Sequence, residues 1–204
     1  MMRFFDFLFP PRVDEKVLRG VSDDEFLSLV DPRLISATRP GTVALFSFGD
    51  PRVRAAIHEA KYHGNERAFM LLATVLAEYL RDADDVRLTK SNIVSVPLGK
   101  IRQKEREFNQ VEEVVARAAK LLGGATVDAA LLERARETIS QVSLPRDARE
   151  ENMRGAFKTT RRADPAHTYI LIDDVITTGA TLGAAIIALK EAGAEHIIPL
   201  ALAH

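Results

Sequence analysis

The chain has 204 residues, no cysteine, a formal net charge of −1, 47% hydrophobic residues and 28% charged residues. This length favours a single domain with a modest extra segment, and the composition excludes disordered and collagen-like proteins. Without cysteine the chain can form no disulfide, thiolate nucleophile or cysteine-bound zinc site, and its 28 basic and 29 acidic residues give no overall attraction to nucleic acid or acidic lipid.

The first eleven residues, MMRFFDFLFPP, are apolar except for Arg3 and Asp6, and no small-residue cleavage site follows them. This pattern is not typical of a signal peptide and favours a hydrophobic arm that packs on the body of the protein or on a partner. No segment approaches the ~18 consecutive apolar residues that a membrane span requires. We therefore expect a cytoplasmic protein with no membrane-embedded part.

The segment after this arm is expected to be rich in helices. Ser22 with Glu25 three positions later forms a capping-box pattern, which predicts a short helix that ends before Asp31. The further elements predicted here are a strand over 42–48 and helices over 51–62 and 66–81, with start and stop signals at Asp50-Pro51 and His63-Gly64-Asn65. We expect residues 1–85 to form the arm and an α-rich hood, and residues 86–204 to form the core.

From residue 92 onward the pattern alternates between strands and helices. The predicted elements are strands over 93–97, 129–134, 156–159, 169–172 and 196–202, and helices over 108–122 and 181–192. Such alternation predicts an α/β protein with a parallel sheet and helices on both faces. The polar stretch over 135–154 is longer than most connections, so we expect it to act as a lid over a site.

The most informative segment begins with the apolar strand over 169–172 and continues as Asp173-Asp174-Val-Ile-Thr177-Thr178-Gly179-Ala-Thr181. In open α/β sheets, ligands bind beyond the carboxyl ends of the strands. A helix N-terminus there offers unpaired N–H groups and partial positive charge to a phosphate, and nearby threonine hydroxyls add donors. A glycine in the loop lets the backbone approach the phosphate closely.

The two aspartates at the end of this strand suit a different part of a ligand. Asp173 and Asp174 would repel a phosphate, but they can accept strong hydrogen bonds from sugar hydroxyls. Carboxylates for a sugar beside amides for its phosphate predict a site for a pentose phosphate.

This segment resembles the phosphoribosyl pyrophosphate (PRPP) motif of type I phosphoribosyltransferases. Further blocks resemble those of the ComF family, whose phosphoribosyltransferase-like members are linked to DNA uptake; they lie at 61–64, 96–98, 106–110, Gln141 and 149–157. The resemblance covers residues 43–204. It implies the type I phosphoribosyltransferase fold, with a mainly parallel sheet of about five strands flanked by helices and an α-rich N-terminal hood.

The resemblance also implies which residues hold PRPP. The expected PRPP-binding residues are Asp173, Asp174, Val175, Thr177, Thr178, Gly179, Ala180 and Thr181, with the two aspartates as the catalytic pair. The expected pyrophosphate loop contains Leu98, Gly99, Lys100 and Arg102, and the expected flexible loop contributes Arg136, Arg146 and Arg149. Mg²⁺ is expected to arrive with PRPP and to be held by the ligand and water, so no direct protein ligand is assigned.

Two features depart from the family pattern. Family members typically begin with cysteine pairs that form a small zinc-binding module, and this chain keeps Phe9-Pro10-Pro11 but has no cysteine. Glu107 stands where the family has the glycine of its Arg-Gly-Phe-Asn-Gln block. A carboxylate near a polyanion is unfavourable unless it points away or pairs with a neighbouring cation.

Two functions of different classes remain open at this point. One is transfer of the phosphoribosyl group from PRPP·Mg²⁺ to a nitrogen nucleophile. The other is a non-catalytic PRPP- or nucleotide-binding adaptor that acts with DNA-uptake machinery. An ordinary nucleobase salvage enzyme is disfavoured by the ComF-like blocks, no direct nucleic-acid binding is evident, and the sequence leaves the oligomeric state open, a homo-oligomer included.

Other polar residues are expected to be structural. His58 and His63 are five positions apart across a helix end, which is the wrong spacing for a shared ligand on one helical face. Lys61-Tyr62 is expected to pack the hood onto the sheet, with a substrate-facing role as the alternative. Arg161-Arg162 is expected to be a solvated pair rather than a phosphate site.

Overall fold

The computed structural model describes residues 12–83, 90–99, 103–104, 106, 108–136 and 152–204. Its main sheet has the strand order β1-β2-β8-β7-β3-β4 among these residues. The strands are β1 Arg33–Ile35, β2 Thr42–Phe46, β3 Ser91–Ser95, β4 Thr126–Val127, β7 Thr168–Val175 and β8 His196–Ala203. All neighbouring pairs are parallel except β1 with β2. The expected α/β class with a mainly parallel sheet is therefore confirmed.

The centre of the sheet is β7, which lies between β3 and β8. Ile170 is opposite Ile93 on one side and Ile198 on the other. Ile170 and Ile172 pack with one apolar cluster and Tyr169 and Leu171 with another, as expected for a strand covered on both faces.

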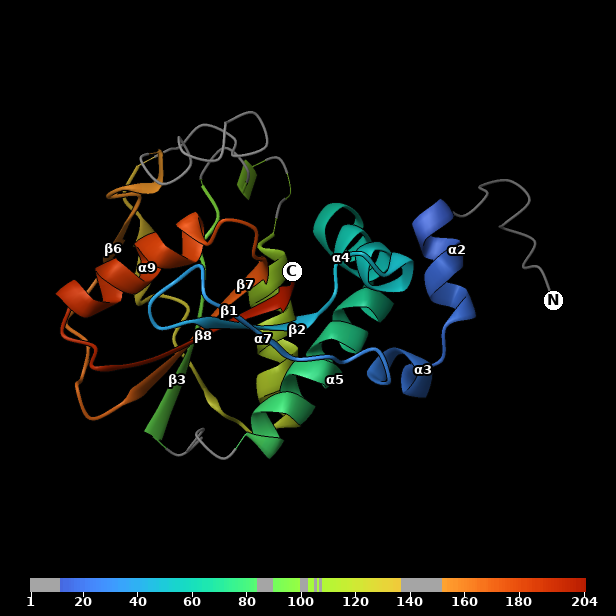
Figure 1. The fold of residues 1–204 in the computed structure, drawn as a ribbon, viewed down its shortest axis with the longest axis horizontal. Helices are drawn as coiled ribbons and strands as arrows, with labels where there is room; N and C mark the ends of the chain where they lie inside the picture. Colours follow the sequence, from blue (N-terminus) through green and yellow to red (C-terminus); the bar gives the residue numbers. More distant parts are fainter. Residues whose placement is uncertain (1–11, 84–89, 100–102, 105, 107, 137–151) are drawn as a thin grey trace.

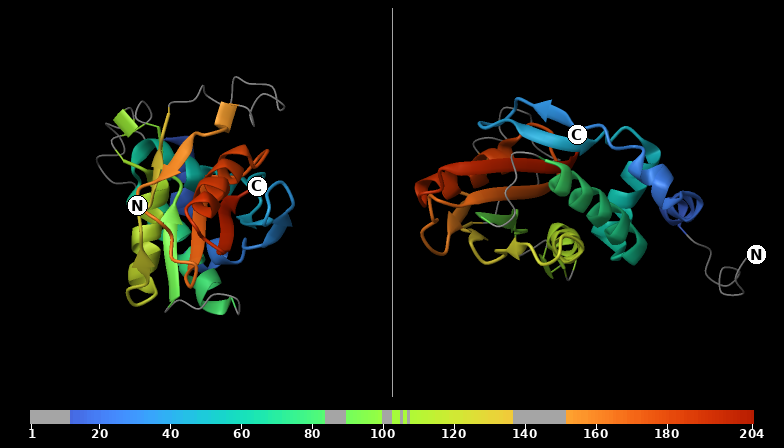
Figure 2. Two further views of the ribbon diagram at one scale, coloured as in Figure 1. Left: turned by 90° about the vertical axis from the view of Figure 1, so that its left-hand side faces the viewer. Right: turned by 90° about the horizontal axis from the view of Figure 1, so that it is seen from below.

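Helices cover the two faces unequally (Figures 1 and 2). One face carries α4 Pro51–His63, α5 Glu66–Asp82 and α7 Gln110–Leu121, and the other carries α9 Ala180–Glu191 with the small sheet of β5 Leu132–Arg134 and β6 Phe157–Thr159. Two more helices, α2 Val13–Gly20 and α3 Asp23–Leu27, pack on α4 and α5 at the end away from α9. The helices on both faces are thus confirmed.

The helices of the N-terminal part begin where the capping signals predict. The side chain of Ser22 accepts a hydrogen bond from the Glu25 backbone at 3.2 Å, and that of Asp50 accepts one from the Arg52 backbone at 2.8 Å. Asn65 caps α5 in the same way. These side chains satisfy backbone N–H groups that the first helical turn leaves unpaired.

The structure adds elements and shifts some boundaries. The sequence pattern missed β1 and β4, because strands of two or three residues are too short to show a period. It also missed the eight-residue helix α2, whose N-cap Arg12 makes no side-chain cap and so leaves no capping signal. The central strand was predicted to end at Ile172, but it continues to Val175 because Asp173 and Val175 still pair with Ala201 and Ala203 of β8. Likewise α7 begins at Gln110 rather than Phe108, because the side chain of Asn109 caps it.

The N-terminal part does more than cover the core. Its strand β2 pairs with β8 in parallel, with Val43 opposite Leu200, and β1 extends that edge. Residues on either side of the expected boundary at 85 therefore share one sheet, and the division into hood and core stays a prediction. None of the helices in the described part of the chain combines the length and the apolar character that a membrane span requires.

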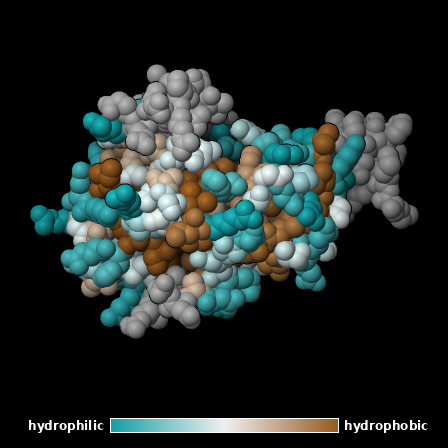
Figure 3. All heavy atoms as spheres, in the orientation of Figure 1, coloured by the Kyte–Doolittle hydropathy of each residue, from teal (hydrophilic) through white to brown (hydrophobic). Residues whose placement is uncertain are grey.

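Apolar side chains are also found at the surface. Leu34 on β1 is 68% exposed and Ile187 on α9 is 58% exposed. On the face of the molecule that is turned toward the viewer in Figure 1, Figure 3 shows apolar residues gathered over the middle, with hydrophilic residues interspersed among them.

Candidate phosphoribosyl-binding pocket

A pocket of about 330 Å³ lies beyond the carboxyl ends of β3 and β7, and we call it the aspartate pocket. From β7, the following loop and α9 it is lined by Asp173, Asp174, Val175, Thr177 and Thr181. Other side chains reach it from α4, α7, β5 and the segment after β3; those used below are His58, Lys61, Tyr62, Leu98, Arg106, Gln110 and Arg134. The sequence motif and residues far from it thus share one cavity at the end of the sheet where ligands bind in such folds.

Asp174 is held by three donors from three parts of the chain. Its Oδ2 accepts hydrogen bonds from Lys61 Nζ at 2.7 Å and from Gln110 Nε2 at 2.8 Å. Its Oδ1 accepts one from the Val175 backbone at 2.7 Å. Burial by itself would raise the pKa of Asp174, but the charge of Lys61 and these hydrogen bonds outweigh it and lower the pKa.

Asp173 behaves differently from its neighbour. Burial and then the charge of Asp174 raise the pKa of Asp173 to about 7. Its Oδ1 accepts a hydrogen bond from the Asp174 backbone at 2.9 Å. Near neutral pH the pair therefore carries less than two negative charges, with the charge held mainly by Asp174.

Helix α4 supplies one wall of the aspartate pocket. His58, Lys61 and Tyr62 are three and four positions apart, so they share a face of α4, and this face lines the pocket. Glu59 lies on a different face and is buried, with 1% of its side chain exposed. The helix therefore has one polar face toward the site and another toward α2 and α5.

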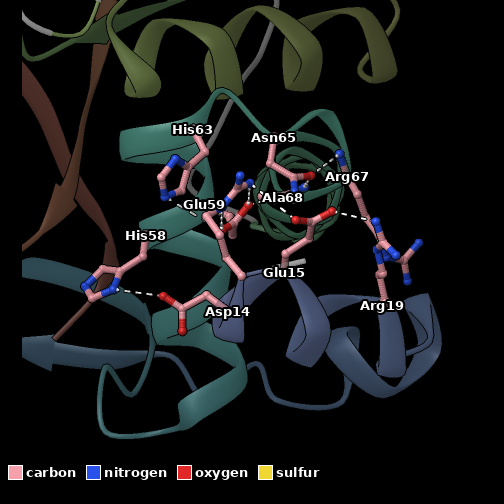
Figure 4. Close-up of polar contacts among 10 residues, drawn as sticks. Asp14, Glu15, Arg19, His58, Glu59, His63, Asn65, Arg67 and Ala68 are labelled. Carbon is pink, nitrogen blue, oxygen red and sulfur yellow. Dashed lines mark hydrogen bonds and ion pairs between the residues drawn. The ribbon is translucent and has the colours of Figure 1, made fainter. Parts of the chain in front are cut away.

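The second polar face anchors α4 (Figure 4). Glu59 accepts hydrogen bonds from Arg12 at 2.9 and 2.6 Å and from Asn65 Nδ2 at 2.9 Å. These bonds lower the pKa of Glu59, with the hydrogen bond from Arg12 as the largest cause. Figure 4 also shows Asp14 of α2 pointing toward His58, whose Nδ1 lies 3.3 Å from Asp14 Oδ2. The position of the pocket wall thus depends on contacts with the N-terminal helix.

Each residue of the block over 108–110 makes a different contact with the rest of the chain. Phe108 packs edge-on against Phe69 with ring centroids 5.8 Å apart. Asn109 is buried; its Oδ1 caps α7 by accepting from the Val111 backbone at 3.0 Å, and its Nδ2 donates to Val96 O at 3.2 Å. With its neighbour fixed in this way, Gln110 reaches Asp174. This block therefore joins α7 to the ends of β3 and β7.

Two guanidinium groups complete the charged lining. The guanidinium carbon of Arg106 lies 5.1 Å from the centroid of the Tyr62 ring. The same guanidinium group donates a hydrogen bond to Gln110 Oε1 at 3.3 Å. Arg134 stacks on the ring of Phe157 at 5.2 Å. Together with Lys61, they place cations from three separate segments around the aspartates.

The loop before α9 divides its residues between two cavities. Thr177 and Thr181 line the aspartate pocket, whereas Thr178, Gly179 and Ala180 line a neighbouring cavity next to residues 36–39. Gly179 has φ +77°, and a Cβ there would lie 3.0 Å from the Cβ and the O of Ala37. Only a glycine fits this left-handed position beside the β1–β2 connection without strain.

The predicted pyrophosphate and flexible loops are only partly described. Leu98 lines the aspartate pocket, and Gly99 accepts a hydrogen bond from the Gln103 backbone at 2.9 Å. The predictions for Lys100, Arg102, Arg146 and Arg149, and those for Gln141 and Glu107, lie outside the described residues.

The side chain of Arg136 donates hydrogen bonds to backbone carbonyl groups. It donates from Nε to Arg154 O at 3.1 Å and from its guanidinium to Asn152 O at 3.0 Å. Its predicted role toward pyrophosphate stays a prediction.

Sequence reasoning did not assign several residues that face the aspartates. The family-like block that contains Gln110 predicts no chemical role for it, and the sequence predicts packing for Lys61, with a substrate-facing role as the alternative. The sequence indicates no site role for Arg106 or Arg134 as individual residues. Helical spacing from Lys61 to His58 could have indicated a common face, but not which element that face meets. Among the described residues no cluster of three or more metal-ligating side chains is found.

No family model matches the chain. Over 130 residues the chain is 31% identical to Competence protein F of Haemophilus influenzae, a match that covers 62% of this chain and 56% of that protein. The chain thus spans little more than half the length of the curated relative that it matches. A solved structure described as the allosteric regulatory enzyme of purine biosynthesis covers 72% of this chain and 30% of its own, with 18% identity and a TM-score of 0.45. The sequence similarity to Competence protein F thus agrees with the predicted resemblance to the ComF family, and the structure has an α/β fold.

Proposed function

We propose that this protein binds PRPP with Mg²⁺ in the aspartate pocket and transfers the phosphoribosyl group to a nitrogen nucleophile. The observation that carries the proposal is the convergence on one cavity of the aspartate pair, Thr177 and Thr181 around the start of α9, and three cationic side chains. Carboxylates suit sugar hydroxyls, whereas cations and hydroxyls suit phosphate groups.

The charges of the pocket favour a polyanion despite the two carboxyl groups. The raised pKa of Asp173, caused by burial and the neighbouring charge of Asp174, lowers the negative charge of the pair near neutral pH. Lys61, Arg106 and Arg134 supply positive charge from three directions. A ligand with a diol and several phosphates can therefore meet both kinds of group without placing phosphate on the aspartates.

The proposed reaction depends mainly on positioning. Asp173 and Asp174 would hold the ribose hydroxyls, while Thr177, Thr181 and the N-terminus of α9 would hold the 5-phosphate. Leu98–Gly99 backbone groups, with Lys100 and Arg102, would face the pyrophosphate. As the C1–pyrophosphate bond breaks, the ribose would gain oxocarbenium character, and the nitrogen nucleophile would form the new bond to C1. Fixed charges would stabilise the departing diphosphate, part of whose charge Mg²⁺ bound to PRPP would neutralise.

A second candidate is a non-catalytic adaptor that binds PRPP or a nucleotide and acts with DNA-uptake machinery. The name of the similar protein, Competence protein F, favours this class. An adaptor would use the same pocket, so both candidates share ligand binding, and turnover of PRPP distinguishes the transferase.

Calorimetry with PRPP·Mg²⁺ tests the shared part of both candidates. Asp174→Asn should weaken binding at least ~10-fold, since a charged hydrogen-bond partner is typically worth over 1 kcal/mol. Asp24→Asn is the matched control, because Asp24 is exposed on α3 and should leave binding unchanged. No binding by the native chain, or equal binding by the Asp174→Asn variant, would refute the site.

Pyrophosphate release then separates the two candidates. Release that depends on an added nucleobase or another nitrogen nucleophile supports the transferase. Binding of PRPP with no release over a broad acceptor set supports the adaptor.

A further inference from the structure

The contact between Lys61 and Asp174 joins two segments that are 113 positions apart. Lys61 Nζ lies 2.7 Å from Asp174 Oδ2, and 23% and 15% of the two side chains are exposed. A pair this sheltered is screened much less by solvent than a surface pair. The charge of Lys61 therefore acts strongly on the aspartate it meets.

The two aspartates differ in their donors. Asp174 accepts from an ammonium group, a side-chain amide and a backbone N–H. Asp173 accepts from the backbone N–H of Asp174. Two carboxyl groups side by side in a sheltered place do not both ionise readily, so the one with the cation keeps its charge more easily.

We propose that Lys61 is a positioning residue for this pair: its ammonium group fixes Asp174 as the ionised member and leaves Asp173 as the member that takes up a proton. The inference deepens the proposed PRPP site and rests on it for its biological meaning. With Lys61 in place, the pair presents one carboxylate that accepts hydrogen bonds and one carboxyl group that also donates near neutral pH. A ligand with adjacent hydroxyls can satisfy both.

The remaining charged and titratable groups that the structure describes around the pair come from several elements. His58 and Tyr62 lie beside Lys61 on α4, Arg106 precedes α7, and Arg134 lies on β5. Gln110 of α7 also contacts Asp174 but is neutral. Among these groups Lys61 is the cation for which the structure gives a direct contact with the pair.

The direct test follows the two carboxyl groups by ¹³C NMR of protein labelled at the aspartate Cγ, with peaks assigned from Asp173→Asn and Asp174→Asn. In the native chain we expect one of the two to titrate well above the other. Lys61→Met should raise the Asp174 midpoint by about one pH unit or more, since a nearby opposite charge shifts a carboxyl pKa by about 1–3 units. Lys61→Arg should keep the native midpoint.

Control variants separate this effect from general damage. Lys120→Met removes an exposed lysine at the end of α7 and should leave both midpoints unchanged. Lys61→Gln, which is neutral but can still donate a hydrogen bond, serves where Lys61→Met does not fold, and should raise the Asp174 midpoint in the same direction. Midpoints that stay native in the folded neutral variants overturn the inference.

Calorimetry with PRPP·Mg²⁺ between pH 6 and 9 tests whether this role of Lys61 affects ligand binding in the aspartate pocket. Lys61→Met should bind at least ~10-fold more weakly at pH 7, and Lys61→Arg should restore most of the affinity. If the midpoints move as expected but the native chain binds no PRPP, the proposed function fails and the role of Lys61 stands. If the native chain binds PRPP while neutral variants keep native midpoints and affinity, the role of Lys61 fails and the proposed function stands.

Discussion

Arg12 and Glu59 form a two-pronged ion pair across 47 positions of the chain, at 2.9 and 2.6 Å. Arg12 is half-exposed, with 47% of its side chain accessible, whereas Glu59 is buried at 1%. The pair joins the residue before α2 to the helix α4, another face of which lines the aspartate pocket. Its loss would leave a buried carboxylate without its cation.

Arg12→Met should lower the free energy of unfolding by about 1–3 kcal/mol, because removing one partner of a buried pair is costly and the exposure of Arg12 reduces that cost. Arg19→Met is the matched control, since the pair of Arg19 with Glu15 lies on the surface within one helix, and it should cost about 0.5 kcal/mol or less. Urea unfolding measures both. Equal costs for the two variants would contradict the proposed importance of Glu59.

The same pair predicts a pH dependence. The pKa of Glu59 is lowered, chiefly by the hydrogen bond from Arg12, so its contribution to stability is present above its ordinary pKa of 4.5 and is lost as the pH falls through the lower native pKa. The stability difference between the native chain and Arg12→Met should therefore shrink below pH 4. A difference that stays constant down to the acid transition would show that Glu59 is not its source.

The contribution of Asp173 to stability should change with pH in the opposite direction to that of Glu59. Its pKa is raised from 3.8 to about 7 by burial and by the charge of Asp174, so the native state binds a proton that the unfolded chain releases. This stabilisation is present below pH 4 and is lost as the pH rises to about 7. Relative to the native chain, Asp173→Asn should gain stability steadily over this range and level off above it, as followed by urea unfolding. A gain that does not vary with pH would contradict the raised pKa.

Two glycines of the α9 region should respond in opposite ways to alanine. Gly179→Ala places a Cβ at φ +77° and 3.0 Å from Ala37, and should cost about 1–2 kcal/mol. Gly183→Ala adds a Cβ inside α9 with no atom within 4 Å, and should stabilise by up to ~1 kcal/mol. Thermal unfolding of the two variants checks this contrast. A stable Gly179→Ala would mean that the β1–β2 connection moves aside freely.

The buried Asn109 should matter more than an exposed cap. Asn109→Ala removes the cap of α7 and the donor to Val96 O, and should cost about 2–3 kcal/mol. Ser22→Ala, which removes only the cap of the short helix α3, should cost about 1 kcal/mol or less. Calorimetry should also show weaker PRPP·Mg²⁺ binding by Asn109→Ala, because Gln110 would lose its fixed position. An unchanged affinity for PRPP·Mg²⁺ would show that the Asn109 cap is not needed to hold Gln110 in place for ligand binding.

Local features of the chain could be predicted from residue types alone. Ser22, Asp50 and Asn65 cap helices where the sequence pattern expects them, because capping involves residues only two or three positions apart. The run of four apolar residues before Asp173 predicts a buried strand for the same local reason. Strand ends were harder to predict: β7 continues through the aspartates because β8 pairs with them.

The sequence alone determined the α/β class, the absence of cysteine chemistry and the loop that joins the aspartates to α9, since each depends on composition or on neighbouring residues. Only the tertiary structure brought Lys61 and Gln110 to Asp174 from 113 and 64 positions away. Such contacts depend on how helices pack on the sheet, and periodicity along one helix does not specify its neighbour. The absence of cysteine, which the sequence shows directly, excludes disulfide and thiolate chemistry. The contacts of Asp174 with Lys61 and Gln110 depend on tertiary packing, which the sequence pattern does not show.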